Sequence, residues 1–202
     1  MSGNVGVTGS TADILRSLTA LQSLIDNSIA DVRQSRDTQH PEIFAAAKFA
    51  EEIAAAATLH ATSHGLTLKV IAVDDGARIL GDNRNLAAAI NNLLQNAYKF
   101  TRDGSTVTFR TTASVDRICI EVQDECGGLP AGASAELFHP FEQRDSNRTG
   151  LGLGLAYSQW AIVANGGRLH VRDLPSSGCV LTVDLPRYVH KSNEVALANV
   201  ST

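Results

Sequence analysis

The sequence predicts an α+β fold, a two-layer α/β sandwich with helices on one face of a mostly antiparallel sheet, preceded by a long helix. Three observations support this prediction. Long segments with helical periodicity stand among short segments that alternate between apolar and polar residues. The last strands along the chain come in pairs joined by short turns. The 202 residues, 44% hydrophobic and 19% charged, are enough for one such domain with an appendage.

The first 40 residues are expected to form a unit of their own. Residues 1–9 are rich in Gly and Ser and predict a loop, and Ser10 with Asp13 resembles a capping box that starts a helix ending near Arg36. The apolar positions of this helix, Ile14, Leu18, Leu21, Ile25 and Val32, follow steps of four and three when Ser28 fills the remaining position. Such spacing is typical of a helix that packs on a partner helix, although one amphipathic helix lying on its own domain fits equally well. The polar segment 35–41, which ends in proline, is expected to be a linker.

The remaining elements are predicted from their local patterns. Alanine-rich helical sequence is closed by Gly65, and Asp82 starts the next helix. The expected helices are 45–63, 82–100 and 153–164, and the expected strands are 66–73, 77–80, 105–114, 116–124, 168–173 and 179–185. These elements define an expected domain at 41–187. The tail at 188–202 lacks apolar periodicity and is expected to be disordered.

Composition excludes several classes of protein. A net charge of −4 without any run of Lys or Arg argues against a nucleic-acid partner. Nothing approaches the roughly 18 consecutive apolar residues of a membrane span, and the first residues lack the pattern of a secretory signal. Three cysteines in no metal-ligand spacing favour a reducing compartment. A cytoplasmic protein, or the soluble portion of a larger one, is therefore expected.

Residues 125–149 form an expected loop of about 25 residues, a length typical of lids. The loop leads into RTGLGLGLA, where Gly150, Gly152 and Gly154 alternate with leucines before a predicted helix. Bare N–H groups at a helix N-terminus form an anion site, and glycine lets a phosphate approach them. A plain glycine-rich turn is the alternative, since neither a P-loop nor a dinucleotide fingerprint matches.

The helix NNLLQNAYKF places Asn92, Asn96 and Lys99 on one face. Two amides and an ammonium suit a phosphate with a bound metal, because amide oxygens bind hard cations and an ammonium binds oxyanions. A solvated polar face fits as well, because the opposite face of the helix is apolar in either case.

The segment EVQDECGGLP breaks from a strand into a Gly-Gly turn at Asp124. A carboxylate at a strand end can accept a hydrogen bond from an exocyclic amine, and adjacent glycines let a flat base lie against the backbone. A plain turn that begins with Asp is the alternative.

These motifs occur in one order: Asn-x-x-x-Asn-x-x-Lys on a helix, Asp-x-x-Gly-Gly, Phe-x-x-Phe in the long loop, and Gly-x-Gly-x-Gly opening a helix. In this order they resemble the ATP-binding domain of sensor histidine kinases, within the superfamily shared with gyrase, mismatch-repair and chaperone ATPases. The resemblance covers about residues 42–186. It implies the Bergerat ATP-binding fold, with ATP and Mg²⁺ as ligands.

The resemblance also implies roles for individual residues. The residues it implies for ATP binding are Asn92, Asn96, Lys99, Phe100, Asp124, Gly128, Phe138, Phe141, Arg148, Thr149, Gly150, Leu151, Gly152, Leu153 and Gly154. Among them, Asn96 would hold Mg²⁺ and Asp124 would recognise the adenine amine. Phe138 and Phe141 would anchor the base of the lid.

Two positions qualify this assignment. Cys126 stands where the family usually has glycine, which puts adenine affinity in doubt, although an inert small residue in a turn is the favoured explanation. Arg144 and Arg148 would add charge against the γ-phosphate, and solvated lid cations fit equally well.

The position one helical turn before the metal-binding Asn separates kinases from hydrolases. The ATPases of the superfamily carry a carboxylate there, which activates water. This chain has Asn92, which cannot act as a base. The resemblance therefore implies a bacterial protein-histidine kinase of a two-component system, a transferase that passes the γ-phosphoryl group to His for relay to a response-regulator receiver domain.

The phosphoacceptor itself is expected to lie on a segment absent from this chain. None of the six histidines begins an H-[DE]-x-x-x-P pattern, so autophosphorylation is not expected. The helix from Ser10 resembles the second helix of a dimerisation hairpin, which implies a homodimer in the intact protein. A degenerate domain that serves as a nucleotide sensor or scaffold is the second hypothesis, and an ATP hydrolase is a third that Asn92 disfavours.

Overall fold

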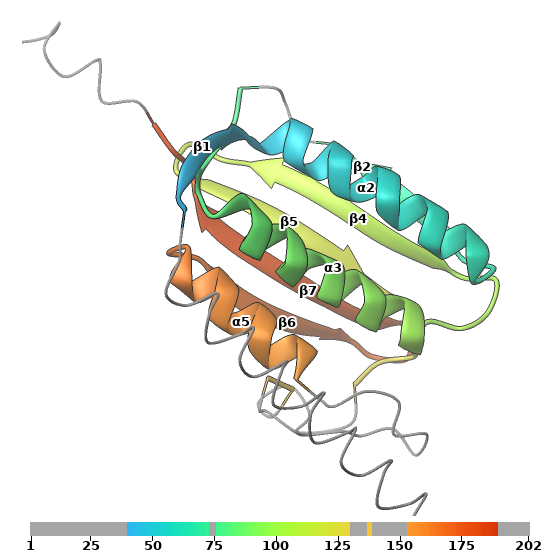
Figure 1. Cartoon of the computed structure of the whole chain (residues 1–202). Coiled ribbons are helices and arrows are strands. Elements are labelled where there is room, and N and C mark those ends of the chain that lie inside the picture. The colour runs from blue at the N-terminus through green and yellow to red at the C-terminus, as the bar shows by residue number, and fades with distance from the viewer. Residues whose placement is uncertain (1–39, 73–75, 130–136, 139–152, 190–202) are drawn as a thin grey trace, which may run out of the picture. The chain divides into compact units, whose positions relative to one another are not determined.

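The computed structural model describes residues 40–72, 76–129, 137–138 and 153–189 (Figure 1). The predicted helix at 10–36, the tail beyond 189 and most of the long loop lie outside these ranges. Within them, helices α2 (Ala46–Ser63), α3 (Asn83–Phe100) and α5 (Gly154–Ala164) lie on one face of a five-stranded sheet. The predicted α+β sandwich is confirmed. No helix in the described ranges is long and apolar enough to cross a lipid bilayer.

The main sheet has the strand order β2-β4-β5-β7-β6. Its strands are β2 (Thr67–Ile71), β4 (Thr106–Ala113), β5 (Arg117–Gln123), β6 (Arg168–Leu174) and β7 (Gly178–Pro186). β2 runs parallel to β4, and every other neighbouring pair is antiparallel. The prediction of a mostly antiparallel sheet is therefore confirmed, with the one parallel pair at its edge.

A second, two-stranded sheet is absent from the sequence-based prediction. It pairs β1 (Glu42–Ala45) with β3 (Arg78–Gly81) in antiparallel register. The segments on either side of residues 74–76 are both strands, as expected, but they belong to different sheets. β1 has only four residues and follows a proline, so the sequence carries too few positions to show the period of a strand.

Helix α3 carries several candidate site residues, and its position is fixed by a cap at its N-terminus and by the packing of its buried face. The side chain of Asp82 caps the helix by accepting a hydrogen bond from the backbone N–H of Asn85 at 3.0 Å. The buried side of the helix meets the sheet through side chains that are at most 1% exposed: Leu86, Ile90, Leu93 and Leu94 from the helix, and Val107, Phe109, Ile118 and Ile120 from the strands. Complete burial of such a side chain contributes about 1.5–3 kcal/mol, so the core holds the exposed edge of α3 in place.

Helix α2 packs on the sheet through a stripe of buried alanines, which lets it approach α3 closely. The hydroxyl of Tyr98 on α3 donates to the backbone oxygen of Ala57 on α2 at 3.1 Å. Burial raises the pKa of Tyr98 from 10.0 to about 12, because the phenolate would lose its hydration there. This tyrosine is therefore a neutral link between the two helices.

We expect the Tyr98→Phe variant to lose part of the alkaline sensitivity of the protein. Since the folded-state pKa lies above the unfolded value, the stabilisation from the neutral phenol is complete below pH 10 and is lost as the pH rises through about 12. The fall amounts to about 2 kcal/mol. Urea unfolding between pH 8 and pH 12 should show a smaller loss of unfolding free energy in Tyr98→Phe than in the unmodified chain, after a uniform cost of about 1 kcal/mol for the missing hydrogen bond. Tyr188→Phe is the control, and equal pH dependence in both variants would refute the assignment.

Candidate functional site

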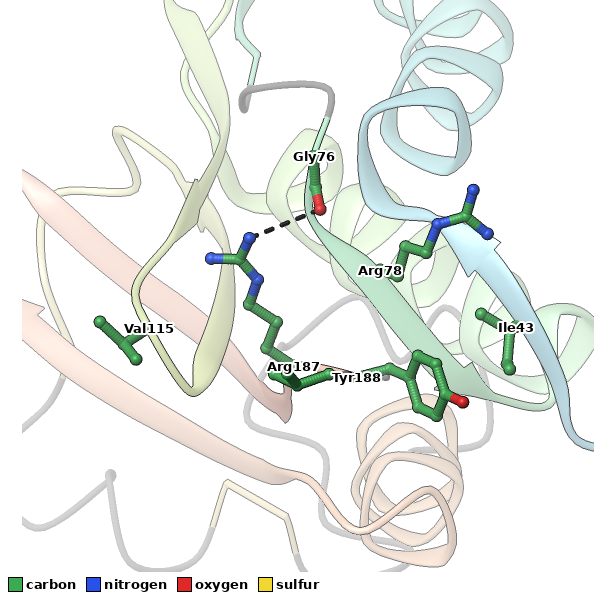
Figure 2. A pocket seen from close by; sticks show the side chains of 7 residues that line it. Ile43, Gly76, Arg78, Val115, Arg187 and Tyr188 are labelled. Atoms are coloured by element: carbon green, nitrogen blue, oxygen red, sulfur yellow. Dashed lines mark hydrogen bonds between the residues drawn. The ribbon is translucent and has the colours of Figure 1, made fainter. Parts of the chain in front are cut away.

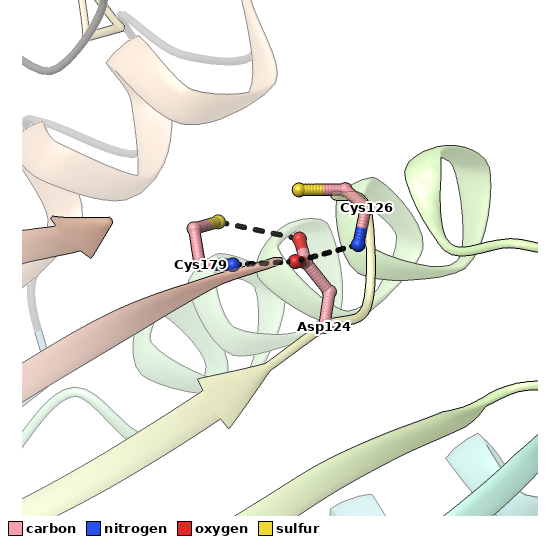
Figure 3. A group of neighbouring side chains, drawn as sticks. All are labelled: Asp124, Cys126 and Cys179. Atoms are coloured by element: carbon pink, nitrogen blue, oxygen red, sulfur yellow. Dashed lines mark hydrogen bonds between the residues drawn. The ribbon is translucent and has the colours of Figure 1, made fainter. Parts of the chain in front are cut away.

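Asp124 stands at the junction of β5 and the glycine turn and is only 4% exposed. Its Oδ1 accepts hydrogen bonds from the backbone N–H groups of Cys179, at 2.8 Å, and Cys126, at 3.3 Å. Its Oδ2 accepts a hydrogen bond from the thiol of Cys179, at 3.3 Å (Figure 3). One carboxylate oxygen is thus held by two backbone donors, while the other accepts from a thiol, a weak donor, and keeps acceptor capacity for a ligand.

The turn after Asp124 requires glycine. Gly127 and Gly128 have φ angles of +93° and +101°, in the region that side chains with a Cβ rarely adopt. The backbone N–H of Gly127 donates to the oxygen of Ser177 at 3.0 Å, and that of Leu129 donates to Oδ1 of Asp173 at 2.7 Å. These bonds fasten the turn to the end of β6 and to the segment between β6 and β7, which explains the Gly-Gly pair of the sequence.

The start of α5 lies directly against the polar edge of α3. A Cβ placed on Gly154 would come within 3.9 Å of Cγ of Asn92. The fully buried hydroxyl of Ser158 lies 3.1 Å from the backbone oxygen of Ala89 and 2.9 Å from that of Gly154, and its one proton is shared between them. The structure therefore brings Asn92 and Gly154, 62 positions apart in the sequence, close to each other.

The other predicted residues of α3 lie toward its C-terminal end. Asn96 is half-buried, whereas Lys99 and Phe100 are exposed, with the Lys99 ammonium 4.9 Å from the centre of the Phe100 ring. Just past the helix, the hydroxyl of Thr101 accepts a hydrogen bond from the backbone N–H of Glu125 at 3.3 Å. α3 thus touches both the start of α5 and the segment that follows Asp124.

The remaining predicted residues divide into two groups. Phe138 is partly buried and packs against the core, and Leu153 precedes the first residue of α5. The residues outside the described ranges are Phe141, Arg144, Arg148, Thr149, Gly150, Leu151 and Gly152. For these the sequence-based assignments stay predictions.

Gly178 and Cys179 are neighbours of Asp124 that the sequence analysis did not select. A Cβ on Gly178 would collide with the backbone oxygen of Asp124, and Cys179 donates to its carboxylate through both its backbone N–H and its thiol. In the sequence these two residues only mark the start of a strand. Nothing in their local pattern indicates a contact with a residue 55 positions earlier.

The two thiols beside Asp124 are kept in their protonated form. Burial raises the pKa of Cys179, and the charge of Asp124 raises it further. Burial also raises the pKa of Cys126, together with hydrogen bonding to Asp124. Near neutral pH each sulfur therefore carries its proton, and the Cys179 thiol is available as a donor to the carboxylate.

An open groove of about 670 Å³ lies elsewhere, between the small sheet and the turn that joins β4 to β5 (Figure 2). It is lined by Ile43, Gly76, Arg78, Val115, Arg187, Tyr188 and Val189, and the guanidinium of Arg187 donates to the backbone oxygen of Gly76 at 3.4 Å. Val115 precedes β5 and Asp124 follows it. A seven-residue strand spans about 23 Å, so this groove is separate from the Asp124 site.

Comparison with protein families identifies one match within the chain. Residues 81–189 match the family described as histidine kinase-, DNA gyrase B-, and HSP90-like ATPases, which is more than half of the 202 residues. The matched region begins just before α3 and includes Asp124, the glycine turn, α5 and β7.

Curated relatives are sensor proteins that are much longer than this chain. Sensor protein TorS of Escherichia coli is 35% identical over 116 residues, which cover 57% of this chain and 13% of that protein. The alginate biosynthesis sensor protein KinB of Pseudomonas aeruginosa is 32% identical over 113 residues, which cover 56% of this chain and 19% of that protein. The chain spans less than a fifth of either relative.

Solved structures share the fold. The mycobacterial sensor histidine kinase MprB aligns with a TM-score of 0.64 and 21% identity, over 75% of this chain and all of that one. Full-length ShkA in complex with AMPPNP aligns with a TM-score of 0.71 and 24% identity, over 94% of this chain and 41% of that one. At these identities the likeness concerns the fold alone.

Proposed function

The chain belongs to the family of histidine kinase-, DNA gyrase B-, and HSP90-like ATPases, as an ATP-binding catalytic domain of the histidine-kinase type, and from this premise we propose what it does. It binds Mg-ATP and transfers the γ-phosphoryl group to a His outside this chain, for relay to an Asp of a response regulator. Residues 41–187 form the catalytic domain in this proposal. Residues 1–40 supply a dimerisation helix and linker to a homodimer in the cytoplasm.

The single observation that carries the proposal is the arrangement around Asp124. The buried carboxylate is oriented by two backbone N–H groups on Oδ1, so Oδ2 is held at a fixed position with acceptor capacity left. A purine amine is a neutral donor that a buried carboxylate binds with a charge-assisted hydrogen bond. Gly127 and Gly128 expose backbone next to it, where a flat base can lie.

The phosphate end of the nucleotide is proposed to lie between α3 and the start of α5. Among the described residues, no side chain caps the N-terminus of α5, which presents its first N–H groups and the positive end of the helix dipole beside Asn92. Lys99 adds positive charge from the same side of α3, and Gly150 and Gly152 extend the anion site in the preceding segment.

Asn96 fits the role of a Mg²⁺ ligand, because an amide oxygen is a hard donor and the residue is half-buried one turn after Asn92. When bound, Mg²⁺ would offset phosphate charge and polarise the γ-phosphoryl group. The amide of Asn92 cannot take a proton from water, so attack on the phosphorus awaits an imidazole from elsewhere. The absence of a base at this position favours kinase over hydrolase.

We expect Asn96→Ala to reduce the contribution of Mg²⁺ to nucleotide binding. In calorimetric titrations with a non-hydrolysable ATP analogue, Mg²⁺ should tighten binding to the unmodified chain, and this gain should shrink by about 10- to 100-fold in Asn96→Ala. Gln95→Ala, at the exposed neighbouring position of α3, is the matched control and should keep the gain. An equal response to Mg²⁺ in both variants would count against Asn96 as the ligand.

Phosphotransfer is tested separately. The chain is mixed with Mg-ATP and a helical hairpin that bears a phosphoacceptor His, and acid-labile phosphate on the hairpin is measured beside free phosphate. Phosphohistidine without steady phosphate release supports the kinase. Steady release without phosphohistidine would favour a hydrolase, and a folded chain that binds no nucleotide would favour the scaffold.

A further inference from the structure

Three side chains with metal-binding atoms meet at the C-terminal end of β5. Asp124, Cys126 and Cys179 each offer one ligand atom, and these atoms all lie within 4.8 Å of one another (Figure 3). Asp124 and Cys179 are buried and Cys126 is half-buried. They come from the end of β5, the glycine turn and the start of β7, so the cluster depends on the fold and not on a local spacing.

The backbone holds these three groups together. The N–H of Asp124 donates to the oxygen of Cys179 at 3.0 Å, and the N–H of Gly127 donates to the oxygen of Ser177 at 3.0 Å. Cys126 lies between these two bonds, and the positive φ angles of the residues after it turn the chain back toward β7. The donor atoms are therefore brought to one place before any ligand arrives, which lowers the cost of ordering them.

The electrostatics of the cluster favour a cation. In the part of the chain that the structure describes, Asp124 has no ion-pair partner, and its carboxylate is surrounded by two N–H groups and a thiol. Two cysteine sulfurs with one carboxylate oxygen are a set that suits zinc, whereas Mg²⁺ prefers oxygen ligands alone. The half-exposed side at Cys126 leaves room for a fourth ligand from water.

We propose that Asp124, Cys126 and Cys179 form a binding site for Zn²⁺ or a similar transition-metal dication. We propose further that the cation and the nucleotide exclude each other there. On binding, both thiols release their protons to solvent, and the ion gains two thiolates and one carboxylate. Mutual exclusion rests on the proposed function, because the ion takes the same Oδ2 of Asp124 that the adenine amine would use.

The site itself is tested without nucleotide. The full chain, kept reduced, is titrated with Co²⁺ as a spectroscopic probe and then with Zn²⁺ in competition. We expect one ion per chain, with a thiolate-to-cobalt charge-transfer band that Zn²⁺ displaces. Cys126→Ser should weaken binding by about tenfold or more and reduce the band. Cys119→Ser, which removes the thiol outside the cluster, should bind as the unmodified chain does.

Two results would overturn the site: a cobalt complex without a thiolate band, or equal Zn²⁺ affinity in Cys126→Ser and the unmodified chain. Either would assign the ion to other groups, such as the exposed His60 and His64.

Exclusion is tested by titrating an ATP analogue with and without saturating Zn²⁺. The apparent Kd for the ATP analogue should rise in the unmodified chain and change much less in Cys126→Ser. Because zinc binds the nucleotide phosphates equally in both titrations, the change in the variant also measures that effect. Unchanged nucleotide affinity in a chain that shows the cobalt band would overturn the exclusion. If the metal-free chain binds no nucleotide, the proposed function fails while the cobalt spectra still decide the site.

Discussion

The Asp124→Asn variant is expected to bind an ATP analogue about 100-fold more weakly than the unmodified chain, or worse. An Asn side chain can keep its oxygen at the position of Oδ1, where the backbone N–H groups of Cys126 and Cys179 hold it. The amide NH₂ then replaces Oδ2. A donor would face the adenine amine, which is also a donor, so a charge-assisted hydrogen bond is replaced by two groups that repel.

Calorimetric titration measures this loss, and thermal unfolding of the same samples shows that the variant is folded. Asp116→Asn is the matched control, because it makes the same chemical change at an exposed turn beyond the other end of β5. It should bind the analogue as the unmodified chain does. Equal affinity for the analogue in Asp124→Asn and Asp116→Asn would show that Asp124 does not bind the adenine.

Gly178→Ala is expected to destabilise the fold by about 3 kcal/mol and to lower the Tm by about 10 °C. The added Cβ would collide with the backbone oxygen of Asp124 and lie 2.8 Å from its Oδ1. Backbone atoms cannot rotate away as a side-chain end can, so β5 and β7 would have to separate. The hydrogen bonds between Asp124 and Cys179 would stretch with them.

Urea unfolding checks this prediction, with Gly76→Ala as the control. A Cβ on Gly76 would meet nothing within 4 Å, so that variant should stay within about 0.5 kcal/mol of the unmodified chain. Nucleotide binding should also weaken in Gly178→Ala below its melting temperature, because the carboxylate is displaced. An unchanged unfolding midpoint would show that the strands tolerate the methyl group.

The main elements of the fold could be predicted because their patterns are local. The helices are long enough to show their period, and β5 alternates buried and half-buried residues along its length. β1 could not be predicted, since four residues carry no measurable period. That β2 and β3 join different sheets depends on contacts with β4 and β1, which no local pattern records.

The same distinction holds for the candidate site: some of its residues could be predicted from local spacing, and others could not. Asn92 and Asn96 could be found from their helical spacing, and Asp124 from the glycines that follow it. Gly178 and Cys179 could not be found, because they reach Asp124 through strand pairing across 54 and 55 positions. From the sequence, Cys126 is a replacement for glycine that puts adenine affinity in doubt, with an inert small residue favoured, whereas the structure places it beside a second thiol and a buried carboxylate.

We propose above all that the buried carboxylate of Asp124 binds the amine of adenine in ATP. The most direct test is a crystal structure of the chain with Mg²⁺ and a non-hydrolysable ATP analogue. We expect the adenine amine within hydrogen-bond distance of Oδ2 of Asp124, and the phosphates between Asn92 and the start of α5. A nucleotide bound in the groove at Arg187, or one whose adenine makes no contact with Asp124, would contradict it.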